Sequence, residues 1–162
     1  MDFTYYLSIF EEAAAQLEKK LPAKKQLETE TGIVLESVCL KLYKKSWTNL
    51  PVSDGSKIFF SIWINDQSLK EQKVLYNIHA FKLRQLNGYK IESRKFADTF
   101  RAAFKPFKNQ WPNVSLLFGP QTLMEGWIKL DEKNLRNEVL KLSTQFLEID
   151  HLIDDALTLY KK

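Results

Sequence analysis

Cysteine, glycine and long apolar runs are all scarce in this sequence of 162 residues. The single cysteine, Cys39, excludes an internal disulfide bond, which fits a reducing compartment, and we expect it to be a small buried hydrophobe. No apolar run approaches the roughly 18 residues that a bilayer-spanning helix needs. The first residues, MDFTYYLSIFEEAAA, lack the basic region of a signal peptide. We therefore expect a cytoplasmic protein that does not enter a membrane.

The motifs of common enzymes are also missing. The five glycines do not cluster into a phosphate-binding loop, and neither a G-x-S-x-G nor an H-E-x-x-H motif occurs. Glu148, His151 and Asp155 have the helical spacing of a di-iron site, but the second Glu-x-x-His motif of such sites is lacking. These side chains also project away from the neighbouring apolar stripe, so we predict a solvated helix face. We predict no metal site and no cofactor; whether the chain is an enzyme stays open, and the missing motifs favour that it is not.

Length and composition favour one domain over residues 1–162. A chain of this length buries roughly 70% of its unfolded surface, so it needs no disulfide or metal to fold. The net charge of +4 is unevenly spread: residues 1–40 have a net charge of −3, residues 41–112 of +9 and residues 131–162 of −2. The strongly basic middle is the feature of composition that favours a nucleic-acid partner.

Hydrophobic periodicity predicts the order of helices and strands. In chain order, it predicts a helix over residues 1–21, strands over 33–43 and 57–66, a strand from about 72 to 84, a helix over 93–108, a hairpin over 111–130 that turns at Gly119–Pro120, and a long helix from Asp131 to Tyr160. The order α-β-β-β-α-β-β-α predicts an α+β fold, with a largely antiparallel sheet covered by helices.

Residues 69–87 fit two structures. A capping-box pattern at Ser68–Glu71 and a glycine at Gly88 favour a helix over 69–87. Alternation favours a strand, because Val74, Tyr76 and Ile78 would share one face. We favour the strand, and the helix remains the alternative.

His79 lies in this ambiguous segment. As part of a strand it would share a face with Asn77 and Phe81, which predicts a structural histidine that hydrogen-bonds within a small polar patch. The alternative is acid–base catalysis by His79 with a carboxylate such as Glu36, and these two are the weak catalytic candidates.

Two surfaces suit a partner. On the helix over 93–108, four basic residues fall along the side opposite the phenylalanines and are the candidates for phosphate contact: Arg94, Arg101, Lys105 and Lys108. The candidates for an aromatic surface that could stack on bases are Phe59, Trp63 and Tyr43. An ordinary solvated helix face and a covered sheet face are the competing interpretations.

We expect a small cytoplasmic α+β protein without catalytic machinery, whose partner is another protein or a second copy of itself. The terminal helical stripes could pair between subunits or pack within one chain. The alternative function is a nucleic-acid-binding or nucleic-acid-processing domain that uses its basic central segment. The identity of any ligand, substrate or partner is not contained in the sequence.

Overall fold

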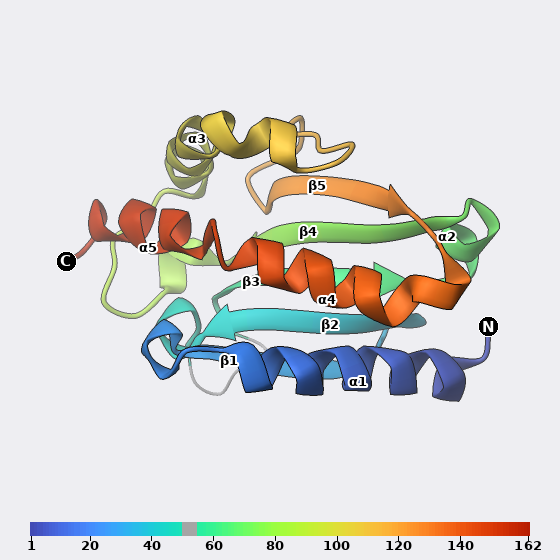
Figure 1. Ribbon diagram of the computed structural model, residues 1–162. Coiled ribbons are helices and arrows are strands. Elements are labelled where there is room, and N and C mark those ends of the chain that lie inside the picture. The colour runs from blue at the N-terminus through green and yellow to red at the C-terminus, as the bar shows by residue number, and fades with distance from the viewer. Residues whose placement is uncertain (50–54) are drawn as a thin grey trace.

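A five-stranded antiparallel sheet forms the centre of the fold (Figure 1). The computed structural model describes residues 1–49 and 55–162. The strands are β1 (Leu27–Val34), β2 (Ser37–Lys44), β3 (Lys57–Ile64), β4 (Lys73–Phe81) and β5 (Thr122–Lys129). They lie side by side in chain order, and all four neighbouring pairs are antiparallel. The expectation of a single α+β domain with an antiparallel sheet and helices packed on it is confirmed.

Helices cover one face of this sheet. They are α1 (Phe3–Lys20), α2 (Asp66–Lys70), α3 (Ser93–Phe104), α4 (Leu135–Phe146) and α5 (Asp150–Thr158). Helices α1 and α4 contact each other and lie across the strands, α1 over β1 and β2 and α4 over β3, while α3 packs on α5 beside β5 (Figure 1). Among the described residues, no helix has the length and apolar character needed to cross a membrane.

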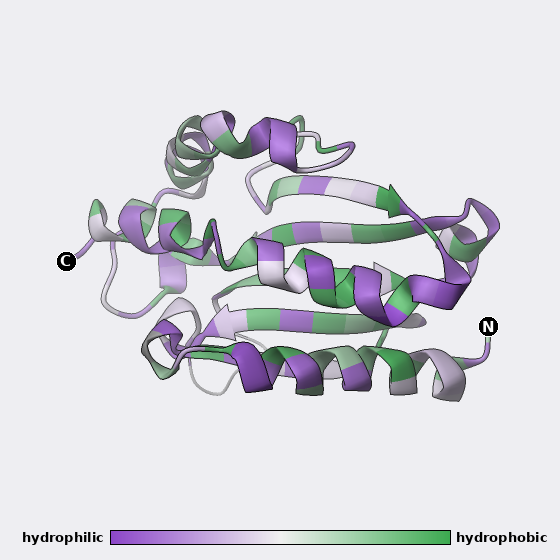
Figure 2. Cartoon of the chain, in the orientation of Figure 1, coloured by the Kyte–Doolittle hydropathy of each residue, from purple (hydrophilic) through white to green (hydrophobic). Residues whose placement is uncertain are grey.

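Period-two alternation along the strands sends apolar side chains into the core beneath the helices (Figure 2). Leu40, Phe60 and Ile78 are fully buried there. Phe60 stacks on Phe146 of α4 with ring centroids 4.5 Å apart, so the sheet and the helix layer share one core. Burying each such side chain stabilises the fold by about 1.5–3 kcal/mol.

The predicted single strand over 33–43 is wrong, because the chain forms a hairpin of β1 and β2 there. The turn consists of Leu35 and Glu36, whose φ angles are +49° and +62°. Two left-handed residues match the twist of a two-residue hairpin, although such turns favour Asn and Gly. A Leu-Glu turn gives no sequence signal, and Glu36 lies in the turn instead of on a strand.

The predicted hairpin over 111–130 is also wrong, because only its second arm forms a strand, β5. Of the first arm, Ser115 alone pairs with Glu125, through two backbone hydrogen bonds of 2.7 and 3.1 Å. Pro112 cannot donate to a strand ladder, and Asn113 has a left-handed φ of +55°, which interrupts an extended backbone.

The segment over 69–87 contains β4, so the favoured strand is confirmed. The predicted capping box at Ser68–Glu71 is wrong, because the capping box lies three residues earlier, at the start of the short helix α2: the Asn65 side chain accepts from the Ser68 backbone, and the Ser68 side chain accepts from the Asn65 backbone. Glu71 is instead the C-terminal cap of this helix. The C-terminal helical segment is present but breaks into α4 and α5 around Leu147–Ile149. Its apolar stripe is buried within the chain, including Val139, Phe146 and Ile153.

Gly126 is required by a close approach inside the core. It lies opposite Tyr76 in the pairing of β4 and β5. A Cβ atom at this position would lie 2.3 Å from the hydroxyl oxygen of Tyr76, which in turn donates to the Pro112 carbonyl at 2.6 Å. Any larger residue would therefore displace a buried tyrosine.

Candidate functional site

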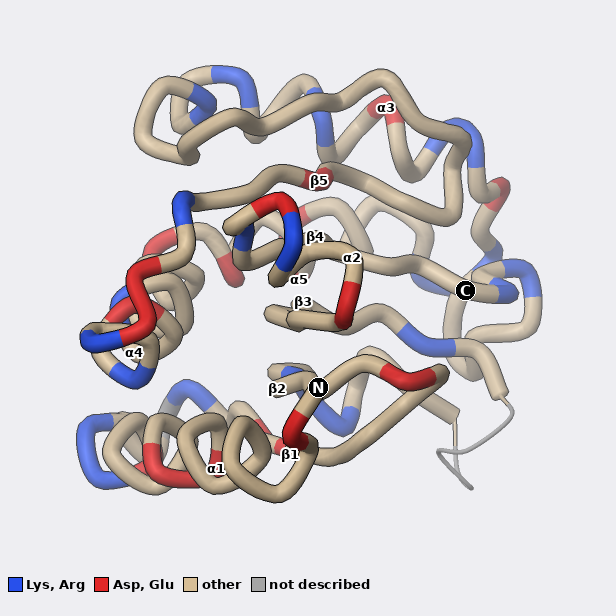
Figure 3. Tube along the Cα trace, turned by 90° about the vertical axis from the view of Figure 1, so that its right-hand side faces the viewer, with Lys and Arg blue, Asp and Glu red and all other residues tan. Residues whose placement is uncertain are grey.

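The face of the sheet opposite α1 and α4 has no described helix packed across it (Figures 1 and 3). We call it the open face. Strand register places the following side chains on it: Cys39, Lys41 and Tyr43 of β2, Lys57, Phe59, Ser61 and Trp63 of β3, Lys73, Leu75, Asn77, His79 and Phe81 of β4, and Glu125, Trp127 and Lys129 of β5. All three predicted aromatic candidates therefore lie on one surface: alternation within β3 places Phe59 and Trp63 there, and the pairing of β2 with β3 adds Tyr43.

A groove runs along β2 and β3 on the open face. One part of it is a hollow of about 290 Å³ whose lining includes Val34, Leu35, Cys39, Phe59, Trp63 and Phe81. A second hollow of about 250 Å³ shares Val34, Lys41, Lys57 and Phe59 with the first, so the two are continuous across the Phe59 ring.

The tip of the β1–β2 hairpin forms an exposed apolar rim to this groove. Val34 and Leu35 line the groove and are 43% and 94% exposed, whereas Ile33 pairs with the core residue Val38 and faces the helix side of the sheet. Leu35 also has a left-handed backbone, which costs a non-glycine residue roughly 1–2 kcal/mol. Val34 and Leu35 thus give the groove an exposed apolar edge that suits contact with a partner.

Aromatic rings and lysines pack together inside the groove. Phe59 lies 5.2 Å from the His79 ring and 5.9 Å from the Phe81 ring, measured between centroids. The ammonium groups of Lys41 and Lys57 lie 4.9 and 5.7 Å from the Phe59 centroid. As a result Phe59 is only 7% exposed, while Trp63 and Tyr43 are half-buried.

A polar network occupies the centre of the open face. Ser61 donates to the Asn77 carbonyl oxygen at 2.6 Å. The Asn77 amide nitrogen lies 2.7 Å from His79 Nε2 and donates to Glu125 at 3.2 Å. The Asn77 companion expected for His79 is therefore present, and the carboxylate of the network is Glu125, whereas Glu36 is exposed at the hairpin tip.

The protonation of His79 follows from its surroundings. Burial lowers its pKa below the ordinary value of 6.5; the Gln121 carbonyl opposes this shift, and the charges of Lys41 and Lys57 add to it. The ring is therefore neutral at pH 7. With Asn77 donating to Nε2, the proton of the neutral ring lies on Nδ1.

This network does not form an activated nucleophile. The hydroxyl of Ser61 donates to Asn77 instead of to His79, and an amide cannot accept and pass on the proton as a general base would. Burial raises the pKa of Cys39, which disfavours its reactive thiolate. The described residues contain no group of three metal-ligating side chains.

The four basic candidates of the 93–108 segment have different surroundings. Arg101 donates to the backbone carbonyls of Phe118, Gly119, Thr122 and Leu123 at 2.8–3.0 Å, so its guanidinium holds the loop before β5 and the first two residues of that strand. Its pKa is lowered by burial, with Asp98 opposing the shift.

The remaining three candidates, Arg94, Lys105 and Lys108, are exposed. None of the four basic residues lines the groove of the open face. The two surfaces considered for nucleic acid therefore do not share one concavity.

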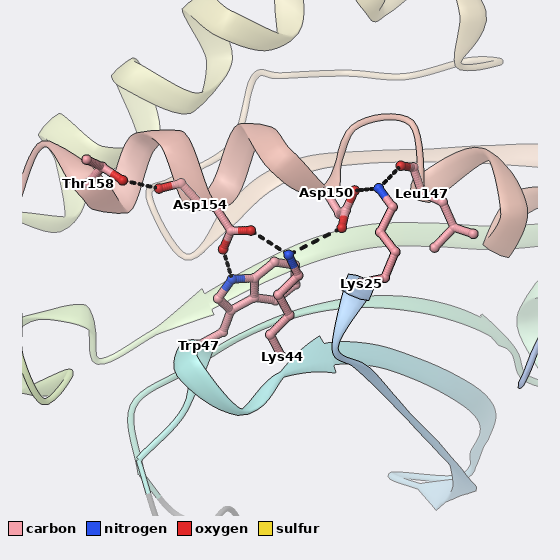
Figure 4. Close-up of polar contacts among 7 residues, drawn as sticks. All are labelled: Lys25, Lys44, Trp47, Leu147, Asp150, Asp154 and Thr158. Carbon is pink, nitrogen blue, oxygen red and sulfur yellow. Dashed lines mark hydrogen bonds and ion pairs between the residues drawn. The ribbon is translucent and has the colours of Figure 1, made fainter. Parts of the chain in front are cut away.

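A second polar cluster, which the sequence did not indicate, fixes α5 to the end of β2 (Figure 4). Lys25 donates to Asp150 at 2.9 Å and to the Leu147 carbonyl at 2.8 Å. The Lys44 ammonium lies between Asp150 and Asp154. Asp154 also accepts from the Trp47 indole at 2.8 Å. The pattern in the sequence that could have indicated this cluster is the four-residue spacing of Asp150 and Asp154, which places both carboxylates on one side of a helix, next to the apolar residues Ile149 and Ile153.

The three acidic and imidazole groups considered as a metal site, Glu148, His151 and Asp155, are exposed on the other side of this helical segment. This agrees with the solvated face expected for them. The carboxylates of this segment that have a structural role are therefore Asp150 and Asp154.

No family model, curated protein or solved structure matches this chain.

Proposed function

We propose that this protein is a non-catalytic interaction module and that the open face is its binding surface, with a second copy of the chain as the partner. The observation that supports this proposal is the pairing of an apolar groove with an exposed apolar hairpin tip on the same face. A two-fold interface needs both complementary shapes on one surface, because each subunit presents the same residues to the other.

The sheet is the apolar surface that stays available for self-association. The terminal helical stripes were the other candidate, but Leu17 of α1 and Val139 of α4 are fully buried within one chain. Packing inside the chain covers most of these stripes, although Phe3 and Leu7 of α1 are half-buried.

In the proposed dimer the open faces of two copies lie against each other, related by a two-fold axis parallel to β3. This axis would place the hairpin tip of one copy against β4 and β5 of the other. Both lie at the same end of the sheet, because Val38 pairs with Ile64, and Leu75 pairs with Trp127. Val34 and Leu35 would then contact Leu75 and Trp127 of the second copy.

The charged residues at this end of the open face would also be complementary between the two copies. Glu36 at the hairpin tip would approach Lys73 and Lys129, which pair with each other across β4 and β5. The Lys73 ammonium lies 4.4 Å from the Trp127 centroid, so apolar and basic groups are adjacent there. An interface between copies would combine an apolar centre with ion pairs at its rim, as stable protein interfaces do.

Analytical ultracentrifugation between about 1 and 200 µM tests this proposal. We expect a concentration-dependent dimer that Leu35→Glu abolishes. Leu159→Glu is the matched control, since Leu159 is 70% exposed in α5's C-terminal turn and should tolerate the charge. Glu36→Lys and Lys129→Glu should each weaken the dimer, and the two together should restore part of it. A monomer at every concentration, or equal losses from Leu35→Glu and Leu159→Glu, would contradict the proposal.

A further inference from the structure

A second groove lies where α3 begins, next to the last residues of the chain. Its volume is about 750 Å³, the largest of the hollows described above. Its lining residues are Arg84, Tyr89, Lys90, Ile91, Glu92, Lys95, Tyr160 and Lys162. We call it the basic groove, because four of these residues are cations and one is an acid.

Backbone hydrogen bonds hold the walls of the basic groove. The Lys90 amide donates to the Tyr160 carbonyl at 2.7 Å, and the Lys162 amide donates to the Gly88 carbonyl at 3.2 Å. The Tyr160 hydroxyl lies 3.0 Å from the Thr99 hydroxyl of α3. Three segments that are distant in sequence are therefore fixed against one another.

The positive charge of this groove is largely uncompensated. Arg84, Lys90 and Lys162 are exposed and make no ion pair with any residue that the structure describes. Lys95 pairs with Glu92 at 3.3 Å, but both side chains are well exposed, so the pair contributes little.

The beginning of α3 adds to this potential. The helix spans twelve residues; its N-cap is Glu92, whose side chain makes no capping hydrogen bond, and no acidic residue follows in the first turn. Because Glu92 and Lys95 at this helix end line the groove, the positive end of the dipole adds to the potential there, and the Glu92 carboxylate offsets part of it.

We propose that the basic groove binds single-stranded nucleic acid. The four cations lie on separate segments along the groove, an arrangement that suits successive phosphates better than one small anion. The half-buried rings of Tyr89 and Tyr160 line the groove between them and offer aromatic surface to bases. This site is separate from the open face and does not depend on self-association.

Fluorescence anisotropy with a labelled twelve-residue oligothymidine at 50–200 mM salt tests the proposal. If the four cations neutralise four phosphates, the logarithm of the affinity should fall with the logarithm of salt with a slope of about −3. The triple variant Arg84→Ala, Lys90→Ala and Lys95→Ala should lose at least about tenfold in affinity and flatten the slope to about −1.

A matched triple variant controls for total charge. Lys70, Lys133 and Lys141 are exposed, lie outside the basic groove and make no ion pair with the described residues. Replacing all three with Ala removes the same charge and should leave the affinity within about twofold. Circular dichroism confirms that both triple variants are folded.

Three results would overturn the proposal. The first is the absence of oligonucleotide binding at 50 mM salt. The second is an equal loss in the two triple variants, which would indicate general charge attraction. The third is equal competition by polyphosphate or by a duplex of matched charge, since neither offers unstacked bases to Tyr89 and Tyr160.

Discussion

Replacing Asp150 with Asn should destabilise the protein by about 2–3 kcal/mol. The carboxylate is 1% exposed and accepts from Lys25 at 2.9 Å, with the Lys44 ammonium 3.5 Å away. Removing one partner of a buried ion pair typically costs about 3–5 kcal/mol, because the other charge is left without compensation. The loss should be smaller here, since Lys25 retains the Leu147 carbonyl and Lys44 retains Asp154.

Urea denaturation followed by circular dichroism measures this change, and an unchanged m-value would show that the native state keeps its compactness. In a chain of this length the same loss lowers the melting temperature by about 5–10 °C. Asp155→Asn is the control, because this carboxylate lies on the same helix but is exposed, and its replacement should cost less than about 0.5 kcal/mol. If both variants were equally stable, the cluster could not be what fixes α5 to the sheet.

The same cluster predicts a pH dependence. Burial alone would lower the pKa of Lys44, but the hydrogen bond to Asp154 and the charges of Asp154 and Asp150 outweigh it, so the pKa is raised above 10.5. A base with a raised pKa in the folded state stabilises the fold fully below its unfolded value. We therefore expect stability to fall as the pH rises above about 10.5, and Asp150→Asn should reduce this dependence.

Two further substitutions test single residues. Arg101→Ala removes hydrogen bonds to four backbone carbonyls and should cost about 2–3 kcal/mol in thermal or urea unfolding. Arg94→Ala, in an exposed position on the same helix, should cost almost nothing, and equal effects would refute the structural role of Arg101. His79→Gln should cost about 1–2 kcal/mol at pH 7.5, where the native ring is neutral. Because the unfolded chain binds a proton more readily than the buried ring, wild-type stability should also fall as the pH decreases through 6.5, and His79→Gln should flatten that part of the profile.

Much of the candidate site on the open face followed from alternation alone. Once β3 was identified, Phe59 and Trp63 had to share a face opposite Phe60 and Ile62, because side chains alternate along a strand. Asn77 and His79 became neighbours for the same reason. No local pattern indicated that Glu125 completes their network, because the pairing of β4 with β5 brings together Asn77 and Glu125, which are 48 positions apart.

Sequence reasoning failed where a local signal was weak or ambiguous. The β1–β2 turn uses Leu35 and Glu36 instead of Asn and Gly, so the hairpin appeared as one strand. Arg101 was grouped with the exposed basic residues from its helical position. Its guanidinium instead binds the loop before β5 and the start of that strand, which only the fold brings within reach.

The sequence by itself determined the α+β class, the buried stripes of the helices and the two faces of the inner strands, because each depends on periodicity within one segment. Tertiary structure decided which of those faces remained uncovered, where the charges gathered and which carboxylates were buried. The ion cluster joins Lys25 and Lys44 to Asp150 and Asp154, and the basic groove joins Arg84 and Lys95 to Lys162. Charged residues far apart in the sequence interact only when packing brings their segments close together. The distances between segments are a property of the whole fold, so no single segment of the sequence contains them.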